Sequence, residues 1–337
     1  MLNAFVNNDP DGDGKKDTLG LTTSGVGYLT SFGANSQGVL STWYKKNDGT
    51  WTNGQITPEF EKSLEYYRDL YTSGLIDPEF APLKYQQAQQ KFASGKAGAI
   101  MYYSDTDWVN GIIGQQFGSA NPSLKPFDCV GLIPYLQADS NAKPVIQKYL
   151  YDMCDIEFSA KCSDEVMDRF LAFDNWALSP DGRVNLLGIK GVDYNEDASG
   201  NKTIIQQNGK NPDIQTKYPS TGIIRMSSWE FDLSDDPTWP QPSYSDPVAA
   251  RALSKANREA RNQYATPVNM YAKLADIPSV ATANSYKISN DISNVITGKQ
   301  PVQTMFNEAV SKAMASGYKQ AIADLEQYMK AHPEQDK

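Results

Sequence analysis

Four closely spaced aspartates near the start of the chain constrain its local structure more than any other feature of the sequence. Counted from Asp9 as position 1, the loop has Asp11 at position 3, Asp13 at position 5, Lys15 at position 7 and Asp17 at position 9. Gly14 falls at position 6, where a loop wrapped around one ion must turn sharply, and the backbone carbonyl of Lys15 can face the same centre. Carboxylates this close together repel one another unless a cation lies between them. The spacing therefore predicts a Ca²⁺ site, because Ca²⁺ takes six to eight oxygen ligands.

The same loop departs from an EF-hand in two ways. Position 12, which is a bidentate glutamate in an EF-hand, is Gly20 in this sequence. The residues after it do not form an amphipathic helix pattern. The sequence therefore indicates a structural calcium clip instead of a regulatory sensor. The alternative is an acidic, solvated turn without a metal.

Composition excludes several classes of protein. The chain has 337 residues, a formal net charge of −9 and 40% hydrophobic residues, which predicts a sizeable core and argues against nucleic-acid binding. A single histidine, His332, excludes histidine-based catalysis and histidine-ligated zinc. Cys129, Cys154 and Cys162 show no metal-binding spacing and allow at most one disulfide. No apolar run approaches the length that a membrane-spanning helix needs.

Helix and strand patterns alternate along the first third of the chain. Thr57 followed by Pro58 predicts a helix start, and the run ends near Gly74. Further helix and strand patterns cover 85–93 and 97–103, and a buried strand is expected over 130–134. Aromatic residues on both sides of 47–49 predict a hairpin. This alternation, with short connections, favours an α/β fold.

The rest of the chain is expected to be mainly helical. Ser163 and Ser179 each begin a helix pattern, and a polar hairpin tip is expected over 195–203. Residues 210–247 are rich in proline and predict a long irregular segment. Three helices are expected near the end of the chain, over 248–264, 302–315 and 318–331.

Several segments, taken together and in order, resemble one protein family. These are the acidic loop with Leu19-Gly20-Leu21 after it, and the segments 51–60, 70–80, 91–98, 173–194 and 296–299. They are similar to the extracellular solute-binding proteins of family 1, which serve bacterial ABC importers and include proteins that bind alginate oligosaccharides. The resemblance covers nearly the whole chain. It implies an α/β, periplasmic-binding-protein-like class II fold of two lobes.

The resemblance also implies a domain organisation. In such proteins a signal peptide, a lipid-anchoring cysteine and most of the N-terminal lobe precede the calcium loop, so part of that lobe is expected to be missing here. Residues 1–130 are expected to form mainly the C-terminal lobe, with the calcium loop at 9–18. Residues 131–205 are expected to contain the crossover and a remnant of the N-terminal lobe. Residues 206–337 would return mainly to the C-terminal lobe.

The function that the resemblance implies is solute capture for import. The expected ligand is an oligosaccharide or another small solute, held in an interlobe cleft by aromatic stacking and hydrogen bonds. The expected partners are the membrane subunits of an ABC permease, and nucleic acid is not expected. The full-length protein would be an extracellular, monomeric lipoprotein.

Aromatic side chains are the main candidates for ligand binding, because a ring face stacks on the C–H-rich face of a sugar while short polar groups bind its hydroxyls. The candidates are Trp108, Asp105, Tyr103, Tyr28 and Trp229. Trp108 follows the Gly-Lys-Ala-Gly strand at the place where the family has a stacking aromatic residue. Asp105 would accept hydroxyl hydrogen bonds, with Tyr103 beside it. The alternative for Trp108 is an ordinary core or helix-cap position, and for Tyr28 and Trp229 it is a core position.

Two other functions compete with solute binding. A glycosidase needs two carboxylates about 5–9 Å apart across a cleft, whereas Asp105 and Asp107 would point to different sides of any regular element. No nucleophile motif or phosphate-binding loop is found, so the chain is not expected to be an enzyme. A calcium-dependent surface or adhesion module without a small ligand is the other alternative.

Overall fold

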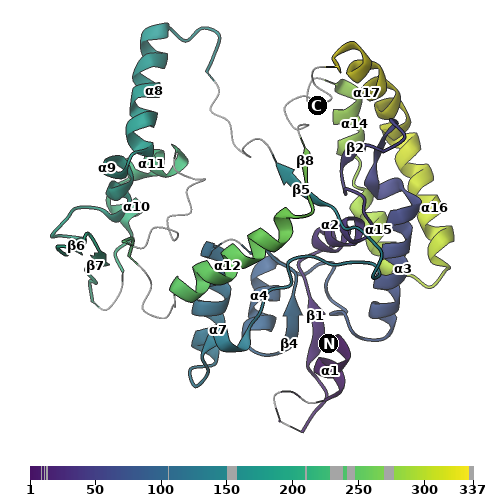
Figure 1. Ribbon diagram of the computed structural model, residues 1–337, viewed down its shortest axis with the longest axis horizontal. Helices are drawn as coiled ribbons and strands as arrows, with labels where there is room; N and C mark the ends of the chain where they lie inside the picture. The colour runs from purple at the N-terminus through teal and green to yellow at the C-terminus, as the bar shows by residue number, and fades with distance from the viewer. Residues whose placement is uncertain are drawn as a thin grey trace. The chain divides into compact units, whose positions relative to one another are not determined.

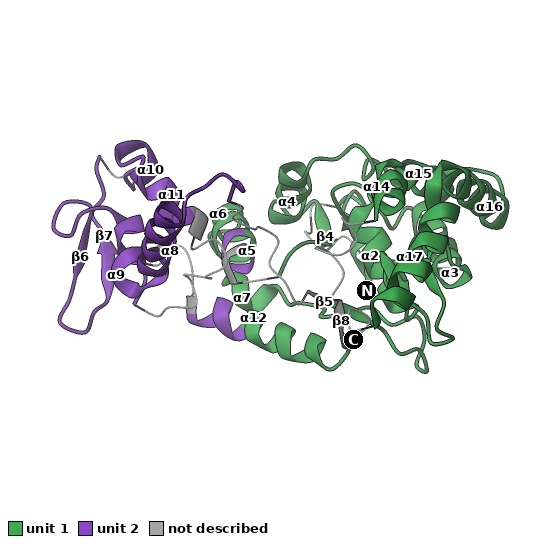
Figure 2. Ribbon diagram, turned by 90° about the horizontal axis from the view of Figure 1, so that it is seen from above, with its two compact units in different colours: residues 1–104, 112–151, 253–337 green, residues 105–111, 152–252 purple. Residues whose placement is uncertain are grey.

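The computed structural model describes residues 1–8, 10, 12, 14–104, 106–149, 158–208, 211–227, 238–240, 247–268 and 277–333. The chain forms two compact units, coloured separately in Figure 2. Unit 1 comprises residues 1–104, 112–151 and 253–337, and unit 2 comprises 105–111 and 152–252. Each unit is therefore assembled from separate stretches of the chain.

Unit 1 contains most of the regular structure, and most of its helices and strands are labelled in Figure 1. Its first half holds α1 (Leu2–Asn7), β1 (Leu19–Thr22), α2 (Gly27–Ser36), β2 (Trp43–Lys45), β3 (Trp51–Asn53), the 3-10 helix η1 (Gly54–Ile56), α3 (Pro58–Thr72), α4 (Tyr85–Ala93) and β4 (Ala97–Ile100). Next come α6 (Gly118–Ala120), α7 (Pro126–Cys129), β5 (Ile146–Tyr149) and β8 (Ala265–Val268). Its C-terminal part holds α14 (Pro278–Ser285), α15 (Ile288–Thr297), α16 (Val302–Ala313), the π-helix η5 (Met314–Tyr318) and α17 (Lys319–Ala331).

Unit 2 is smaller and mostly helical. It holds α5 (Thr106–Val109), α8 (Asp164–Leu178), α9 (Pro180–Arg183), the 3-10 helix η3 (Val184–Leu187), β6 (Tyr194–Glu196), β7 (Lys202–Ile204), α10 (Ile214–Lys217) and α11 (Thr221–Ser227). Two further elements, the π-helix η2 (Asn110–Phe117) and α12 (Pro247–Asn262), contain a unit boundary.

The strands pair two by two. β1 and β4 are parallel, with Leu19 opposite Ala97, and β5 and β8 are parallel, with Ile146 opposite Ala265. β2 with β3 and β6 with β7 form antiparallel hairpins, as expected around 47–49 and 195–203. A parallel bridge between Leu21 and Ile76 adds a third segment beside β1. The fold is therefore α/β, with helices outnumbering strands.

Local capping signals determine where the helices begin. The Thr57 hydroxyl accepts a hydrogen bond from the Phe60 backbone N–H, and Pro58 occupies the first turn of α3. Ser163 and Ser179 cap α8 and α9 in the same way. Each cap satisfies an N–H group that has no partner within its own helix. The predicted starts of these helices are confirmed.

The core of unit 1 is a single large apolar cluster. α3 lies against α2, α15 and α16 there, and α14 lies against α17. The largest side chains that are almost fully buried include Trp43, Tyr67, Phe60 and Phe80. Burial of such side chains contributes roughly 1.5–3 kcal/mol each to folding. Unit 1 therefore has a core of its own that can hold β1 and β4 in place.

One expectation needs correction. Residues 130–134 were expected to form a buried strand, but they have no regular structure and Ile133 is exposed. Pro134 has no N–H to donate to a ladder, and the strands described in this unit pair elsewhere. The compact units divide the chain at other points than 131 and 206, since 112–151 lies in unit 1 and 206–252 in unit 2; the assignment of the three expected stretches to lobes stays a prediction. In unit 2, α11 packs against α8, and Lys202 donates its backbone N–H to the carbonyl of Thr238.

The described part of the chain contains no helix that combines the length and the apolar character needed to cross a membrane.

Candidate functional site

The candidate site lies in unit 1, where the parallel strands β1 and β4 end side by side. The N–H of Met101 donates to the carbonyl of Thr22 at 3.2 Å, so the pairing continues to the end of both strands. The chain leaves β1 through a glycine-containing turn into α2, and it leaves β4 directly into Tyr102 and Tyr103. Ligands of open α/β sheets bind beyond the carboxyl ends of the strands. This end of the sheet is therefore the place to look for a binding surface.

Three tyrosines cluster at this end of the sheet. The ring centroids of Tyr28 lie 5.7 Å from Tyr102 and 5.8 Å from Tyr103, and those of Tyr102 and Tyr103 are 5.4 Å apart. Tyr103 meets both neighbours nearly edge to face, which is a favourable arrangement for aromatic rings. Its side chain is 57% exposed, whereas Tyr28 is half-buried. The cluster therefore presents ring surface to solvent from a packed base.

The hydroxyl of Tyr28 stays protonated at any physiological pH. Burial raises the pKa of Tyr28 well above its usual range, and the neighbouring Tyr103 and Tyr102 raise it further. The side chain is therefore a neutral hydrogen-bonding group beside an aromatic face. Such a surface suits ligands that combine C–H-rich faces with hydroxyl groups.

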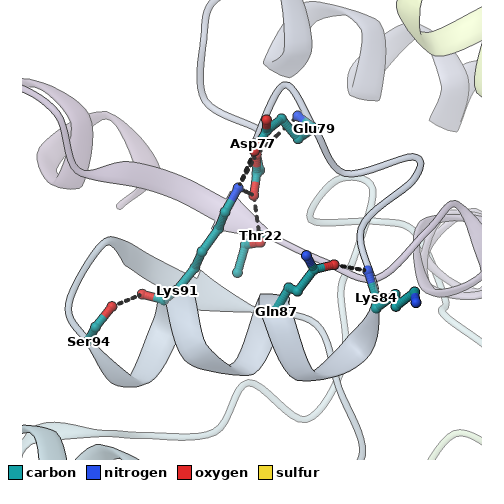
Figure 3. A network of polar contacts seen from close by, with 7 residues as sticks. All are labelled: Thr22, Asp77, Glu79, Lys84, Gln87, Lys91 and Ser94. Carbon is teal, nitrogen blue, oxygen red and sulfur yellow. Dashed lines mark hydrogen bonds and ion pairs between the residues drawn. The ribbon is translucent and has the colours of Figure 1, made fainter.

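A buried polar network holds the end of β1 in place (Figure 3). Asp77 is fully buried and accepts a hydrogen bond from the Thr22 hydroxyl at 2.9 Å. Lys91 of α4 donates to both oxygens of Asp77, at 2.9 and 3.1 Å, and to Glu79 at 2.9 Å. Burial alone would lower the pKa of Lys91, but its hydrogen bonds with Asp77 and Glu79 outweigh burial and raise the pKa. The network therefore ties α4 and the 75–79 segment to the last residue of β1.

The residue that follows the tyrosines is also fixed. The Ser254 hydroxyl donates to the Ser104 carbonyl at 3.0 Å, and the side-chain amide of Asn257 donates to the Ser104 hydroxyl at 2.7 Å. Both partners lie on α12 and are buried. These bonds restrict the segment that carries Tyr102 and Tyr103, so the cluster is preorganised on both sides.

Two of the five predicted ligand-binding residues, Tyr28 and Tyr103, lie together in the structure. Tyr102, which was not among the five, joins them. Trp108 lies within α5 in unit 2 and is 38% exposed, so it is not an ordinary core residue. Asp105 and Trp229 lie outside the described residues. A role for any of these residues in binding stays a prediction.

The acidic loop is described only in part, because Asp9, Asp11 and Asp13 lie outside the described residues. Gly14 has φ +82°, in the left-handed region that favours glycine, as a sharp turn at position 6 requires. Lys15 and Asp17 are exposed to solvent. Among the described residues, no group of three or more His, Cys, Asp or Glu side chains gathers into a metal site.

The structure explains why the loop has no glutamate at position 12. Gly20 is the second residue of β1 and is buried. A Cβ atom there would lie 2.5 Å from the carbonyl oxygen of Leu75 and 3.2 Å from the Cβ of Leu2. No side chain fits at this position without a shift of the backbone. A metal ion in the loop would therefore depend on ligands from positions 1 to 9, as in the predicted set.

Comparison with known proteins relates the chain to binding proteins of bacteria. No protein-family model matches it. It is 23% identical over 337 residues to the polygalacturonan/rhamnogalacturonan-binding protein YtcQ of Bacillus subtilis. This match covers 98% of the chain and 62% of YtcQ. It is 26% identical over 235 residues to the lipoprotein LipO of the same organism, covering 67% of the chain and 44% of LipO.

A solved structure shows the same fold. The ABC-transporter substrate-binding protein FusA of S. pneumoniae, solved as an EF-hand mutant with fructo-nystose, superposes with a TM-score of 0.60. The identity is 16%, and the match covers 98% of the chain and 67% of FusA. The chain is therefore similar over nearly its whole length to a bacterial binding protein, and it shares the fold of a substrate-binding protein of an ABC transporter.

The superposition on FusA confirms the expected fold class, an α/β periplasmic-binding-protein-like fold of two lobes. YtcQ and FusA are binding proteins by name and not enzymes, which agrees with the expectation for this chain. The chain spans 62% of YtcQ and less than half of LipO.

Proposed function

We propose that this extracellular solute-binding protein binds an oligosaccharide and delivers it to the membrane subunits of an ABC importer. The observation that carries the proposal is the tyrosine cluster of Tyr28, Tyr102 and Tyr103 at the carboxyl ends of β1 and β4. Its exposed ring surface and phenol hydroxyls match the mixed surface of a sugar. The names of two relatives, a polygalacturonan-binding protein and a protein solved with fructo-nystose, support a saccharide over other solutes.

Calorimetric titration of the purified chain with a glycan panel tests the proposal. The panel contains fructo-oligosaccharides and oligogalacturonides, and a solute receptor should give one saturable site. Replacing Tyr103 by alanine should weaken binding roughly three- to tenfold, since an aromatic contact is worth about 0.5–1.5 kcal/mol beyond the area that it buries. The matched control is Tyr66→Ala, because Tyr66 is a tyrosine of similar exposure on α3, away from the strand ends.

The outcomes separate clearly. Weaker binding in Tyr103→Ala with unchanged binding in Tyr66→Ala supports the tyrosine cluster as the contact surface. Equal affinity in all three proteins would contradict it. Failure of the wild-type chain to bind any glycan of the panel would contradict oligosaccharide binding altogether.

The acidic loop is proposed to hold a structural Ca²⁺ ion through Asp9, Asp11, Asp13, the Lys15 carbonyl and Asp17. The left-handed backbone of Gly14 fits the turn that such a loop needs, and a solved relative is an EF-hand mutant by name. The ion would neutralise the clustered carboxylates and hold the connection between α1 and β1.

Removal of the ion provides the test. A chelator should lower the thermal unfolding midpoint of the wild-type chain, and added Ca²⁺ should restore it. In an Asp17→Asn variant the same treatment should have a smaller effect. Identical midpoints for the wild-type chain with and without chelator would contradict the calcium site.

The importer partners and the cellular location are proposed by analogy with the similar proteins named above. We propose that the full-length protein acts outside the cell as a lipid-anchored monomer, as one relative is a lipoprotein by name. Two-hybrid or pull-down assays with the membrane subunits of an ABC importer from the same organism would test the partner, and absence of binding in both the loaded and empty states would contradict it.

A further inference from the structure

A polar cavity of about 280 Å³ lies within unit 1, next to the helix that carries Tyr28. One face of α2 forms a wall of this cavity, because Gly27, Thr30 and Ser31 are spaced three and four residues apart and share a side of the helix. The other walls come from four segments that are distant in sequence, including Gln55 after β3 and Gln147 on β5. The fold therefore builds the cavity from many places, within one unit.

The lining of the cavity is polar but uncharged. Its side chains end in hydroxyl groups, such as those of Ser31 and Ser289, or in carboxamides, such as those of Gln55 and Gln147. None of the described residues that line it is a lysine, arginine, aspartate or glutamate. Hydroxyls and amides both donate and accept hydrogen bonds, so this wall can match the hydroxyl groups of a sugar in either direction.

Some of these groups are held in place by the protein. The side-chain nitrogen of Gln55 donates to the Ser41 carbonyl at 2.7 Å, and the Ser41 hydroxyl donates to the Ser31 hydroxyl at 3.3 Å. Gln147 differs from them. Its side-chain nitrogen is buried and has no hydrogen-bond partner among the described residues. A buried donor without a partner costs about 1–3 kcal/mol, so a turn of the Gln147 side chain that lets this nitrogen donate to a ligand oxygen in the cavity is favourable.

The size of the cavity limits what it can hold. Small-molecule sites in proteins measure about 300–1,000 Å³, and this cavity lies at the lower end of that range. It therefore suits one sugar ring and not a longer segment. Gly27 lines the cavity and Tyr28 is the next residue on α2, so the cavity and the tyrosine cluster begin at the same helical turn.

We propose that this cavity binds one uncharged sugar ring of the solute and so selects neutral oligosaccharides over those built from uronic acids. The inference rests on the proposed function, since it assumes that the tyrosine cluster receives a saccharide. A carboxylate that entered the cavity would lose its hydration without meeting a cation, which is strongly unfavourable. A neutral ring would exchange its water contacts for the hydroxyl and amide groups of the wall.

The experiment compares a fructo-oligosaccharide with an oligogalacturonide of the same length by calorimetry. The wild-type chain should bind the neutral ligand at least tenfold more tightly. Gln147→Leu should weaken binding of the neutral ligand roughly fivefold to tenfold, in line with loss of one hydrogen bond. Gln37→Leu, at the end of α2 and outside the lining, is the matched control and should leave affinity unchanged.

A second variant reverses the expected preference. Gln147→Lys introduces a cation into the cavity, so the affinity ratio of neutral to uronic ligand should fall at least tenfold. If a substitution of Gln147 on β5 disturbs folding, Ser31→Ala on α2 tests the cavity instead, because it is a smaller change on a helix face. It should weaken binding of the neutral ligand severalfold.

The results distinguish this inference from the proposed function. If Tyr103→Ala weakens binding while the Gln147 and Ser31 variants bind like the wild type, the tyrosine cluster remains the site and the cavity holds only water. That result overturns the inference alone. A wild-type preference for the oligogalacturonide also overturns it. If the wild type binds neither ligand, both the inference and the proposed function are wrong.

Discussion

Unit 1 and unit 2 each bury an aspartate that pairs with a lysine, but the surroundings of the two aspartates differ. Asp77 of unit 1 lies beside a large apolar core that includes Phe60 and Phe80. Asp193 of unit 2 is equally buried and accepts hydrogen bonds from Lys217 at 2.6 Å and from the Tyr218 hydroxyl at 2.9 Å. The backbone N–H of Ile189 donates to it at 2.9 Å.

The described part of unit 2 has little apolar burial to support this network. Its buried hydrophobic residues are Val109, Ala177, Leu187, Tyr194, Ile224 and Ala250. The long helix α8 buries only Ala177 and exposes Val166, Leu171 and Trp176. We infer that unit 1 is stabilised mainly by its apolar core and that Asp77 adds only local hydrogen bonds. Unit 2 instead depends on the contacts of Asp193 for its stability.

Replacing Asp193 by alanine should have the largest effect. It leaves Lys217 without its partner and removes the bonds that join 189 to 217–218, and loss of the bonds from the Ile189 N–H and the Tyr218 hydroxyl to a charged carboxylate costs about 1.5–3 kcal/mol each. We expect hydrogen exchange to rise throughout unit 2 and to stay unchanged in unit 1. Asp168→Ala, at an exposed position of α8, is the control. Full protection of unit 2 in the Asp193 variant would remove the distinction between the units.

Replacing Asp77 by asparagine should have a smaller effect. Lys91 can still bind Glu79, which is partly in solvent, so we expect a loss of about 2 kcal/mol, the size of a hydrogen bond to a charged group. Denaturant unfolding should show the loss, with unit 1 still folded in water. Glu79→Gln is the control at the edge of the same network and should change little. Global unfolding of unit 1 in the Asp77 variant would show that its core is weaker than inferred.

Acid should affect unit 2 before unit 1. Burial alone would raise the pKa of Asp193, but the hydrogen bonds from Lys217, Ile189 and Tyr218 outweigh burial and lower the pKa. A lowered carboxyl pKa gives stability that is present above about pH 4, the pKa of an unfolded aspartate, and is lost as the pH falls below it. The pKa of Lys217 is raised by Asp193, so its share is lost only in strong alkali.

Hydrogen exchange at pH 5 and pH 3, corrected for intrinsic rates, measures this difference. Protection should fall more in unit 2 than in unit 1 over this interval. Unit 1 also contains an aspartate with a lowered pKa, Asp291, next to Tyr286 and Lys312. Because the core of unit 1 does not titrate, it should keep its protection. An equal fall in both units would contradict the comparison.

The smallest effect is expected at the surface of unit 2. Arg169 and Glu165 form an ion pair on α8 with both side chains largely exposed, and such pairs contribute little. Arg169→Ala should change the free energy of unfolding by no more than about 0.5 kcal/mol in a denaturant titration. A loss of unfolding free energy as large as that of the Asp77 variant would show that the exposed face of α8 contributes more to stability than its exposure indicates.

Much of the local structure was predictable from the sequence, because it depends on neighbouring residues. The starts of α3, α8 and α9 follow from Thr57, Ser163 and Ser179, and the hairpins follow from their turn residues. The expected strand over 130–134 is wrong, because strand formation needs a partner that the local sequence does not reveal. The unit boundaries also depend on distant pairings such as that of Lys202 with Thr238.

The candidate site was predictable only in part. Tyr28 and Tyr103 were chosen singly, from their place near a glycine-rich turn and after a strand. Their meeting depends on the parallel register of β1 and β4, which lie more than 70 residues apart in sequence. The polar cavity was not expected at all. Its lining comes from five separate segments, and serine and glutamine are too common to signal a site on their own.

The most direct test of the central claim is a footprint of a bound oligosaccharide on the chain. Hydrogen exchange is measured with and without a saturating fructo-oligosaccharide, and the protected peptides are located. The account predicts added protection at the start of α2, over residues 25–31, and at the end of β4, over residues 100–104. Protection confined to other parts of the chain, such as the β6–β7 hairpin, or no protection at all, would contradict it.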